Sequence, residues 1–158
     1  MGIIGDHLRL DAATISDTVN TASRIECLTK HYCVNIMISE DCWRQSQSID
    51  HPDQTSYTFR YLGMVQVKGK REPMGIYECI NGDDPEIMEK KIQTIADFNA
   101  AVQYFTAGNF TFAITAIDQV LKNNPQDKTA LFIRKKAIDY HTKGTPENWN
   151  GVELMTEK

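Results

Sequence analysis

This chain of 158 residues lacks the cysteine spacing of a metal site or of a disulfide framework. There is no Cys-x-x-Cys pair and no closely spaced pair of histidines among the ligands that zinc prefers. The four cysteines are Cys27, Cys33, Cys42 and Cys79. We therefore expect reduced, mostly buried thiols, as in a cytoplasmic protein.

Long apolar runs and an excess of basic residues are also absent. No run is long enough to span a membrane, and no basic, apolar leader opens the chain. The Met-Gly start lacks the Ser or Thr that myristoylation requires at the sixth position, which is Asp6. The formal net charge is -4 and the pI is about 5.5, which argues against a general nucleic-acid binder. We expect a soluble, cytoplasmic globular protein with no nucleic-acid partner.

The hydrophobic pattern changes at Gly82-Asp83-Asp84-Pro85. Before this turn signal, strand-like and helix-like segments alternate, whereas every later signal is helical. Proline suits the first position of a helix, because the backbone N–H that it lacks would have no helical partner there. We predict an α+β part over 1–82, a helical part over 83–143 and a polar tail over 144–158.

One amphipathic helix organises the first part. An apolar stripe predicts its buried face, and Asn20 and Arg24 lie one turn apart on another, polar face. The stripe is Val19, Ala22, Ile25 and Leu28. The predicted elements are an extended segment over 7–15, this helix from 16 or 17 to 32, a strand over 34–39, a helix over 40–47 and a hairpin with arms 57–69 and 74–80.

Three helices are predicted after Pro85, over 86–107, 110–123 and 127–143. Several residues match the aromatic, small and terminating positions of a tetratricopeptide repeat, whereas Asp97, Ala100 and Ala101 depart from its early positions. The matching residues are Tyr104, Gly108, Phe110, Ala113 and Pro125. One repeat cannot bury its own face, so a third helix or the first part must cover it. We expect the tail to dock through Trp149.

Asn20 and Arg24 form the first candidate site. The guanidinium of Arg24 is a permanent planar cation suited to phosphate oxygens, and an amide one turn earlier can orient a sugar hydroxyl. Together they could bind a nucleotide. The alternative is a solvated polar face on which Arg24 pairs with a nearby carboxylate.

Lys68 and Lys70 form the second candidate, because they flank Gly69 at the predicted end of the hairpin. A lysine beside glycine can approach a triphosphate closely. The alternative is that both lysines only keep the turn soluble.

Two stretches resemble one family. The stretch "GIIGDHLRLDAATISDTVNTASRIECLTKHYCVNIMISE" closely resembles the second half of the class III adenylate and guanylate cyclase catalytic domain, which has a Val-Asn-x-Ala-Ser-Arg helix before a strand that ends in Ser-Glu. The stretch "RYLGMVQVKGKREPMGIYECI" resembles that domain's final hairpin with its Val-Lys-Gly-Lys turn. The resemblance runs from Gly2 to about Asp83. The helical tail with "PENWNGVELMTEK" is similar to an extension of bacterial members, whose parent chains often carry upstream membrane segments.

The resemblance implies a partial ferredoxin-like cyclase domain, an antiparallel-rich sheet with packed helices, that acts on ATP or, alternatively, GTP. In this family the ribose 3′-oxygen attacks the α-phosphate and pyrophosphate leaves. By resemblance, Asn20 orients the ribose, Arg24 stabilises the α-phosphate and Lys68 holds the triphosphate. Such sites form between two catalytic domains, which implies a homodimer.

The sequence also departs from the family pattern. The two aspartates that hold Mg or Mn lie in contexts that are absent here, and Asp6 is too near Asn20 to be one of them, so we expect no metal ligand and an inactive isolated chain. The family position that contacts the purine base is commonly Asp or Thr, but it is Ala13 in this sequence, and Thr14 is offset from it by one residue. Thr14 and Asp17 are the other candidate substrate contacts.

Three further expectations remain open. The missing early strands should leave an open sheet edge, which we expect to be covered by strand exchange or edge pairing in a homodimer, or by the helical tail. The helical part is, alternatively, a module that binds a protein partner. The parent is, alternatively, a regulatory cyclase-like subunit without catalysis.

Overall fold

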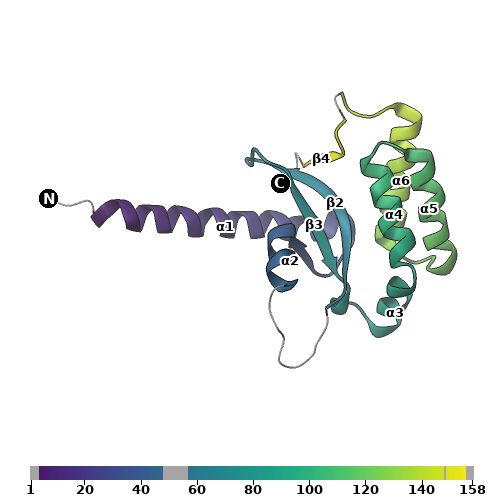
Figure 1. Ribbon diagram of the computed structural model, residues 1–158, viewed down its shortest axis with the longest axis horizontal. Coiled ribbons are helices and arrows are strands. Elements are labelled where there is room, and N and C mark those ends of the chain that lie inside the picture. The colour runs from purple at the N-terminus through teal and green to yellow at the C-terminus, as the bar shows by residue number, and fades with distance from the viewer. Residues whose placement is uncertain (1–3, 48–56, 148, 156–158) are drawn as a thin grey trace.

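The computed structural model describes residues 4–47, 57–147 and 149–155, with the backbone alone for 4–17. The fold is α+β, with a four-stranded mixed sheet and six α-helices in this described part (Figure 1). In chain order the elements are α1 (Ile4–Tyr32), β1 (Met37–Ser39), α2 (Glu40–Gln47), β2 (Phe59–Val67), β3 (Met74–Cys79), the 3-10 helix η1 (Ile80–Gly82), α3 (Pro85–Gln93), α4 (Ile95–Thr106), α5 (Phe110–Asn123), α6 (Lys128–Lys143) and β4 (Val152–Met155).

The strand order of the sheet is β1-β3-β2-β4. The predicted hairpin is confirmed, because β2 and β3 pair antiparallel, and β1 also runs antiparallel to β3. The tail forms a fourth strand that the sequence did not predict, and β4 pairs parallel with β2. Strand β4 therefore covers the β2 edge, where the expected cover of an open edge was a second copy or the helical tail.

Helix α1 is longer than predicted. It begins at Ile4, so the extended segment expected over 7–15 and the helix start expected at residues 16 to 17 are both wrong. A strand needs a partner for its backbone groups, whereas a helix satisfies them locally. Figure 1 shows the first half of α1 extending away from the sheet. Ile25 and Leu28 are buried as predicted, but Ala22 is exposed and Val19 is 60% exposed, because the packed body does not reach that far.

The first of the predicted long helices is divided in two. Thr94 ends α3 and precedes α4, and its buried hydroxyl donates to the carbonyl of Lys90. The predicted start is confirmed, with Pro85 in the first turn and the Asp84 side chain accepting from the N–H of Glu86. Figure 1 shows α4, α5 and α6 side by side on one side of the sheet. In the described residues no helix is long and apolar enough to cross a membrane.

One hydrophobic core joins residues from both sides of the turn signal at Gly82. Helix α4 lies over β2, and each large apolar side chain fully buried here contributes about 1.5 to 3 kcal/mol. The core includes Ile25 and Leu28 of α1, Val65 of β2, Ile76 of β3, Phe98 and Val102 of α4, Ile117 of α5 and Ile133 of α6. The sheet and the helices therefore stabilise each other.

A buried ion network also joins the hairpin to the helices. Arg60 of β2 contacts Glu78 of β3 at 2.7 Å and Asp127, the cap of α6, at 2.6 Å. Lys91 of α3 contacts Glu78 at 2.5 Å and Asp83 at 2.7 Å. The guanidinium carbon of Arg60 lies 3.7 Å from the centroid of the Phe98 ring. Charges this deeply buried are tolerated only when they are paired, so these contacts fix how α3 and α6 meet the sheet.

Asp127 should make the stability of the protein sensitive to acid. Burial raises the pKa of this carboxyl, but the Arg60 guanidinium and the N–H of Ala130 outweigh it and hold the pKa below the ordinary 3.8. Because the folded-state pKa is the lower one, the stabilisation is present above the ordinary value and is lost as pH falls through the folded value. We expect Asp127→Asn to reduce the urea midpoint at pH 7, and the midpoints of variant and parent to converge as pH falls below the folded-state pKa. A difference that does not change with pH would contradict this assignment.

The tail packs on α4 and α6 through Trp149, as predicted. Its ring lies 5.7 Å from that of Phe105 and 5.2 Å from that of Tyr140. Gly151, with φ of +81, passes so close to α4 that a Cβ there would lie 2.6 Å from the carbonyl oxygen of Thr106. These contacts guide the tail from the helices to the edge of the sheet.

Three of the four cysteines are exposed, which corrects the expectation of mostly buried thiols. Cys27 and Cys33 lie near the end of α1, and Cys42 lies on α2, a helix with no buried residue. Only Cys79 is buried, and all four are free thiols.

Candidate functional site

The structure brings together the two candidate sites of the sequence. Arg24 comes from α1 and Lys68 from the turn between β2 and β3. A Cβ built on Gly69 would lie 3.2 Å from Nη2 and 3.4 Å from Nη1 of Arg24, so the guanidinium packs directly on this turn. Asn20 is exposed one helical turn before Arg24. Residues that are far apart in the sequence therefore share one surface.

The turn itself is held by backbone and side-chain hydrogen bonds. The N–H of Lys70 donates to the carbonyl of Val67 at 3.0 Å. Gln66 donates through Nε2 to the carbonyl oxygens of Lys70 at 3.1 Å and Arg71 at 3.0 Å. Sequence reasoning missed Gln66, although a polar residue facing outward beside a Gly-containing turn is a usable signal for such a role. These bonds fix the loop that carries Lys68.

The surface formed by Arg24 and the turn is strongly basic. Lys68, Lys70 and Arg71 follow one another around Gly69, and Lys68 and Arg71 are exposed. Arginine offers a rigid fork and lysine a flexible point charge, and both bind phosphate oxygens. The arrangement can therefore bind an anion with several charges, such as a triphosphate.

This surface does not suit a divalent cation. The charged groups of the turn next to Arg24 include three cations, and Mg²⁺ and Mn²⁺ require oxygen ligands, mainly carboxylates. In the part of the chain that the structure describes, no group of three or more His, Cys, Asp or Glu side chains could hold a metal ion. Thr14 and Asp17 lie on the backbone of α1, but their side chains fall outside the described residues.

Gly69 is expected to be intolerant of substitution. Its φ of +82 disfavours any side chain, and the added Cβ would also push on the Arg24 guanidinium. We expect Gly69→Ala to cost about 1 to 2 kcal/mol in the free energy of unfolding, measured by urea denaturation. Gly108→Ala is the control, since Gly108 has φ of +77 and its Cβ position makes only an ordinary contact, 3.6 Å from Trp149. Equal costs of unfolding for the two variants would show that the contact with Arg24 adds nothing to the cost of the positive φ.

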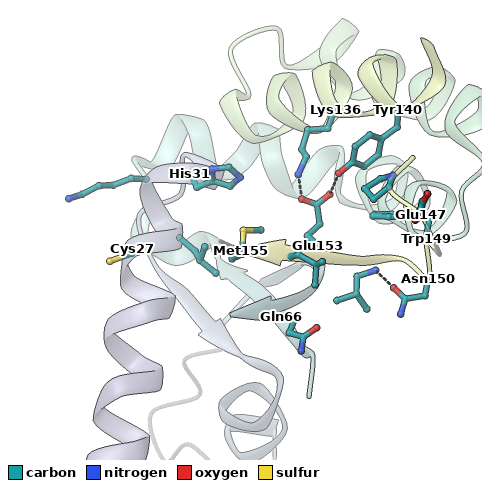
Figure 2. Close-up of a pocket in the computed structure, with 15 residues that line it drawn as sticks. Cys27, His31, Gln66, Lys136, Tyr140, Glu147, Trp149, Asn150, Glu153 and Met155 are labelled. Carbon is teal, nitrogen blue, oxygen red and sulfur yellow. Dashed lines mark hydrogen bonds and ion pairs between the residues drawn. The ribbon is translucent and has the colours of Figure 1, made fainter. Parts of the chain in front are cut away.

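A separate cavity of about 730 Å³ lies between the end of α1, α6 and the tail (Figure 2). Lys136 of α6 forms an ion pair with Glu153 of β4, and the hydroxyl of Tyr140 donates to the same carboxylate at 3.5 Å. Burial lowers the pKa of Lys136 to about 8. Gln66 and Trp149 also line the cavity. Sequence reasoning missed this ion pair, because the unpredicted strand β4 creates it.

The chain is similar to three proteins named adenylate cyclase. It is 44% identical over 79 residues to the adenylate cyclase of Anabaena cylindrica, a match that covers 49% of this chain and 15% of that protein. It is 31% identical over 80 residues to adenylate cyclase 1 of Rhizobium meliloti, covering 51% of this chain and 11% of that protein. The chain is therefore similar in sequence to short parts of proteins named adenylate cyclase.

The third similarity extends into the helical part. The terminal-differentiation-specific adenylate cyclase of Dictyostelium discoideum is 27% identical over 139 residues, which is 87% of this chain. An alignment of that length cannot fit before Gly82, so it includes helices of the second part. The chain spans 6% of that protein. No protein-family model and no solved structure matches the chain.

Proposed function

We propose that this chain provides the cationic side of an adenylate cyclase active site, which converts ATP to cyclic AMP and pyrophosphate in intracellular signalling. The observation that carries the proposal is the contact of Arg24 with the turn that carries Lys68. The similarity to three adenylate cyclases supports it. The proposal includes a second catalytic domain, in the simplest case another copy of the parent chain in a homodimer.

Each residue has one part in the proposed reaction. A bond forms between the ribose 3′-oxygen and the α-phosphorus, the bond from that phosphorus to the pyrophosphate oxygen breaks, and the 3′-hydroxyl proton passes to solvent. Asn20 orients the ribose through its amide. Arg24 stabilises the negative charge that gathers on the α-phosphate, and Lys68 holds the triphosphate. Fixed cations of this kind supply the main electrostatic stabilisation in phosphoryl transfer.

The proposal assigns the metal ions to the other side of the site. The basic surface at Arg24 does not fit Mg or Mn, so no step of the chemistry of this chain runs through a metal ion. We propose accordingly that the isolated chain is inactive. The proposed substrate is ATP, with GTP as the alternative, and Thr14 and Asp17 are the proposed further substrate contacts on α1.

A product assay tests the proposal. The purified chain is incubated with ATP or GTP and Mn, alone and mixed with a class III catalytic domain whose own matching Asn and Arg have been replaced. We expect no cyclic nucleotide from either protein alone and cyclic AMP from the mixture. Product from this chain alone would refute the proposed inactivity, and a mixture as inactive as its parts would refute the assignment of Asn20, Arg24 and Lys68.

A second candidate function is a partner-binding module built on tetratricopeptide-like helices. The observation that favours it is an exposed aromatic pair, Tyr104 of α4 and Phe112 of α5, whose ring centroids lie 5.6 Å apart. A further variant of the main proposal is a regulatory subunit without catalysis. Loss of partner binding in Phe112→Ser, with product formation in the mixed assay unchanged, would favour the module. Nucleotide binding without product in any mixture would favour the regulatory subunit.

A further inference from the structure

Strand β4, which the tail forms, reaches the end of β2 that enters the Lys68-Gly69-Lys70 turn. In the parallel pairing of β4 with β2, Met155 lies opposite Val67, the residue immediately before Lys68. The pairing runs from Met64 to Val67, so β4 supports the whole end of β2 that enters the turn. A strand at a sheet edge is otherwise free to fray, because one row of its backbone groups has no partner.

Glu153 ties this strand to the helices. It is 8% exposed, and its carboxylate contacts both Lys136 and Tyr140 of α6, as Figure 2 shows. A buried carboxylate that lost Lys136 would keep only one weak hydrogen bond, so the ion pair strongly favours this one position of β4. Trp149 and Gly151 fix the chain before the strand, through the aromatic cluster and the carbonyl of Thr106.

Gln66 continues the connection on β2 itself. It lies opposite Leu154 of β4, and its Nε2 donates to the carbonyls of Lys70 and Arg71 beyond the turn. The contacts thus run without interruption from α6 through Glu153 and β4 to β2, and through Gln66 to the loop that packs on Arg24.

We propose that Gln66, together with β4 as anchored by Glu153, positions the Lys68-Gly69-Lys70 turn against Arg24. The effect on catalysis rests on the proposed function, whereas the positioning of the turn rests on the contacts alone. Lysine side chains on an unsupported turn would sample many positions, and a displacement of about 1 Å can cost about a hundredfold in rate. Gln66 and Glu153 are therefore positioning residues that do not touch the nucleotide.

The test follows the N–H of Lys70, which donates to Val67 within the turn. Hydrogen exchange is measured on the full chain for the parent, Gln66→Leu, Glu153→Gln and the charge-reversed pair Lys136→Glu with Glu153→Lys. Leu154→Ser is the control, since Leu154 lies on the same strand but is 66% exposed. Urea denaturation of each variant separates local loosening from global unfolding.

We expect Gln66→Leu and Glu153→Gln to speed exchange in the turn by about tenfold or more, with core amides unchanged, and the charge-reversed pair to restore slow exchange. Leu154→Ser should exchange like the parent. In the mixed assay both single variants should lower kcat more than they raise KM for ATP.

Unchanged exchange in the turn of both single variants, or a rise in Gln66→Leu that the core amides share, would overturn the positioning role. If Glu153→Gln destabilises the whole chain, the charge-reversed pair decides, because recovered stability without slow exchange in the turn would also contradict the proposal. If the unsubstituted chain gives no product in the mixture, the proposed function fails. The exchange data still decide whether Gln66 and β4 position the turn.

Discussion

Arg24→Ala is expected to lower cyclic AMP formation in the mixed assay by at least about a hundredfold, because loss of one preorganised charge-stabilising group typically costs 10²–10³ in rate. The reason is positional as well as electrostatic. The guanidinium packs on Gly69, so it is held beside the turn that carries Lys68, the residue proposed to hold the triphosphate. Alanine removes the charge and leaves α1 otherwise intact, since alanine is the best helix former.

Two controls sharpen this result. Arg24→Lys keeps one positive charge but loses the planar fork, so we expect intermediate activity. Arg44→Ala removes a solvent-facing arginine whose partner is Glu40 one turn earlier, and it should leave activity unchanged. Full activity of Arg24→Ala, or an equal loss in Arg44→Ala, would show that Arg24 has no special role.

Arg60→Met is expected to cost about 3 to 5 kcal/mol in the free energy of unfolding, the range found when one partner of a buried ion pair is removed. Methionine keeps much of the side-chain volume, so the loss is mainly electrostatic. Asp127 would retain only the N–H of Ala130, and Glu78 only Lys91. Both carboxylates would stay buried with too few partners. Urea denaturation at pH 7 measures the difference.

The control for this substitution is Arg134→Met. Arg134 also forms an ion pair at 2.6 Å, with Asp118, but the two side chains are 40% and 45% exposed. Its removal should cost less than about 1 kcal/mol, because water already screens such a pair. Similar costs for both variants would contradict the claim that the buried network holds the hairpin to α3 and α6.

Elements with strong local signals were predictable from the sequence. The hairpin follows from two β-rich arms around a Gly- and Pro-containing turn, and α3 begins where Pro85 and the Asp84 cap place it. Helix α2 matches its predicted span, 40–47. In each case short-range chemistry and the tertiary structure favour the same conformation.

Features that depend on distant contacts were not predictable. The stripe on α1 continues to Val19, yet only residues that reach the body of the protein, such as Ile25, can be buried. The sequence of the tail is mostly polar and does not predict a strand. Strand β4 forms because the edge of β2 has backbone groups with which it can pair. Arg60 and Glu78 stand on the core-facing side of alternating strands, a pattern that signals buried pairing but does not identify Asp127 as the third partner.

The candidate site was predicted in its parts but not in its assembly. Asn20, Arg24 and Lys68 carry chemistry that their side chains reveal, and the family resemblance gives each a role. The contact between Arg24 and Gly69 depends on how α1 packs against the sheet, and the role of Gln66 on the shape of the turn. Packing of this kind is a property of the whole fold.

The role of this chain as the cationic side of a cyclase site is tested by a titration in the mixed assay. A fixed amount of the Asn- and Arg-deficient catalytic domain receives increasing amounts of this chain, with ATP and Mn, and cyclic AMP is measured. We expect product that rises with the added chain and saturates, and no rise when the added chain carries Arg24→Ala. No product at any amount of the parent chain, or the same curve for both chains, would contradict this role.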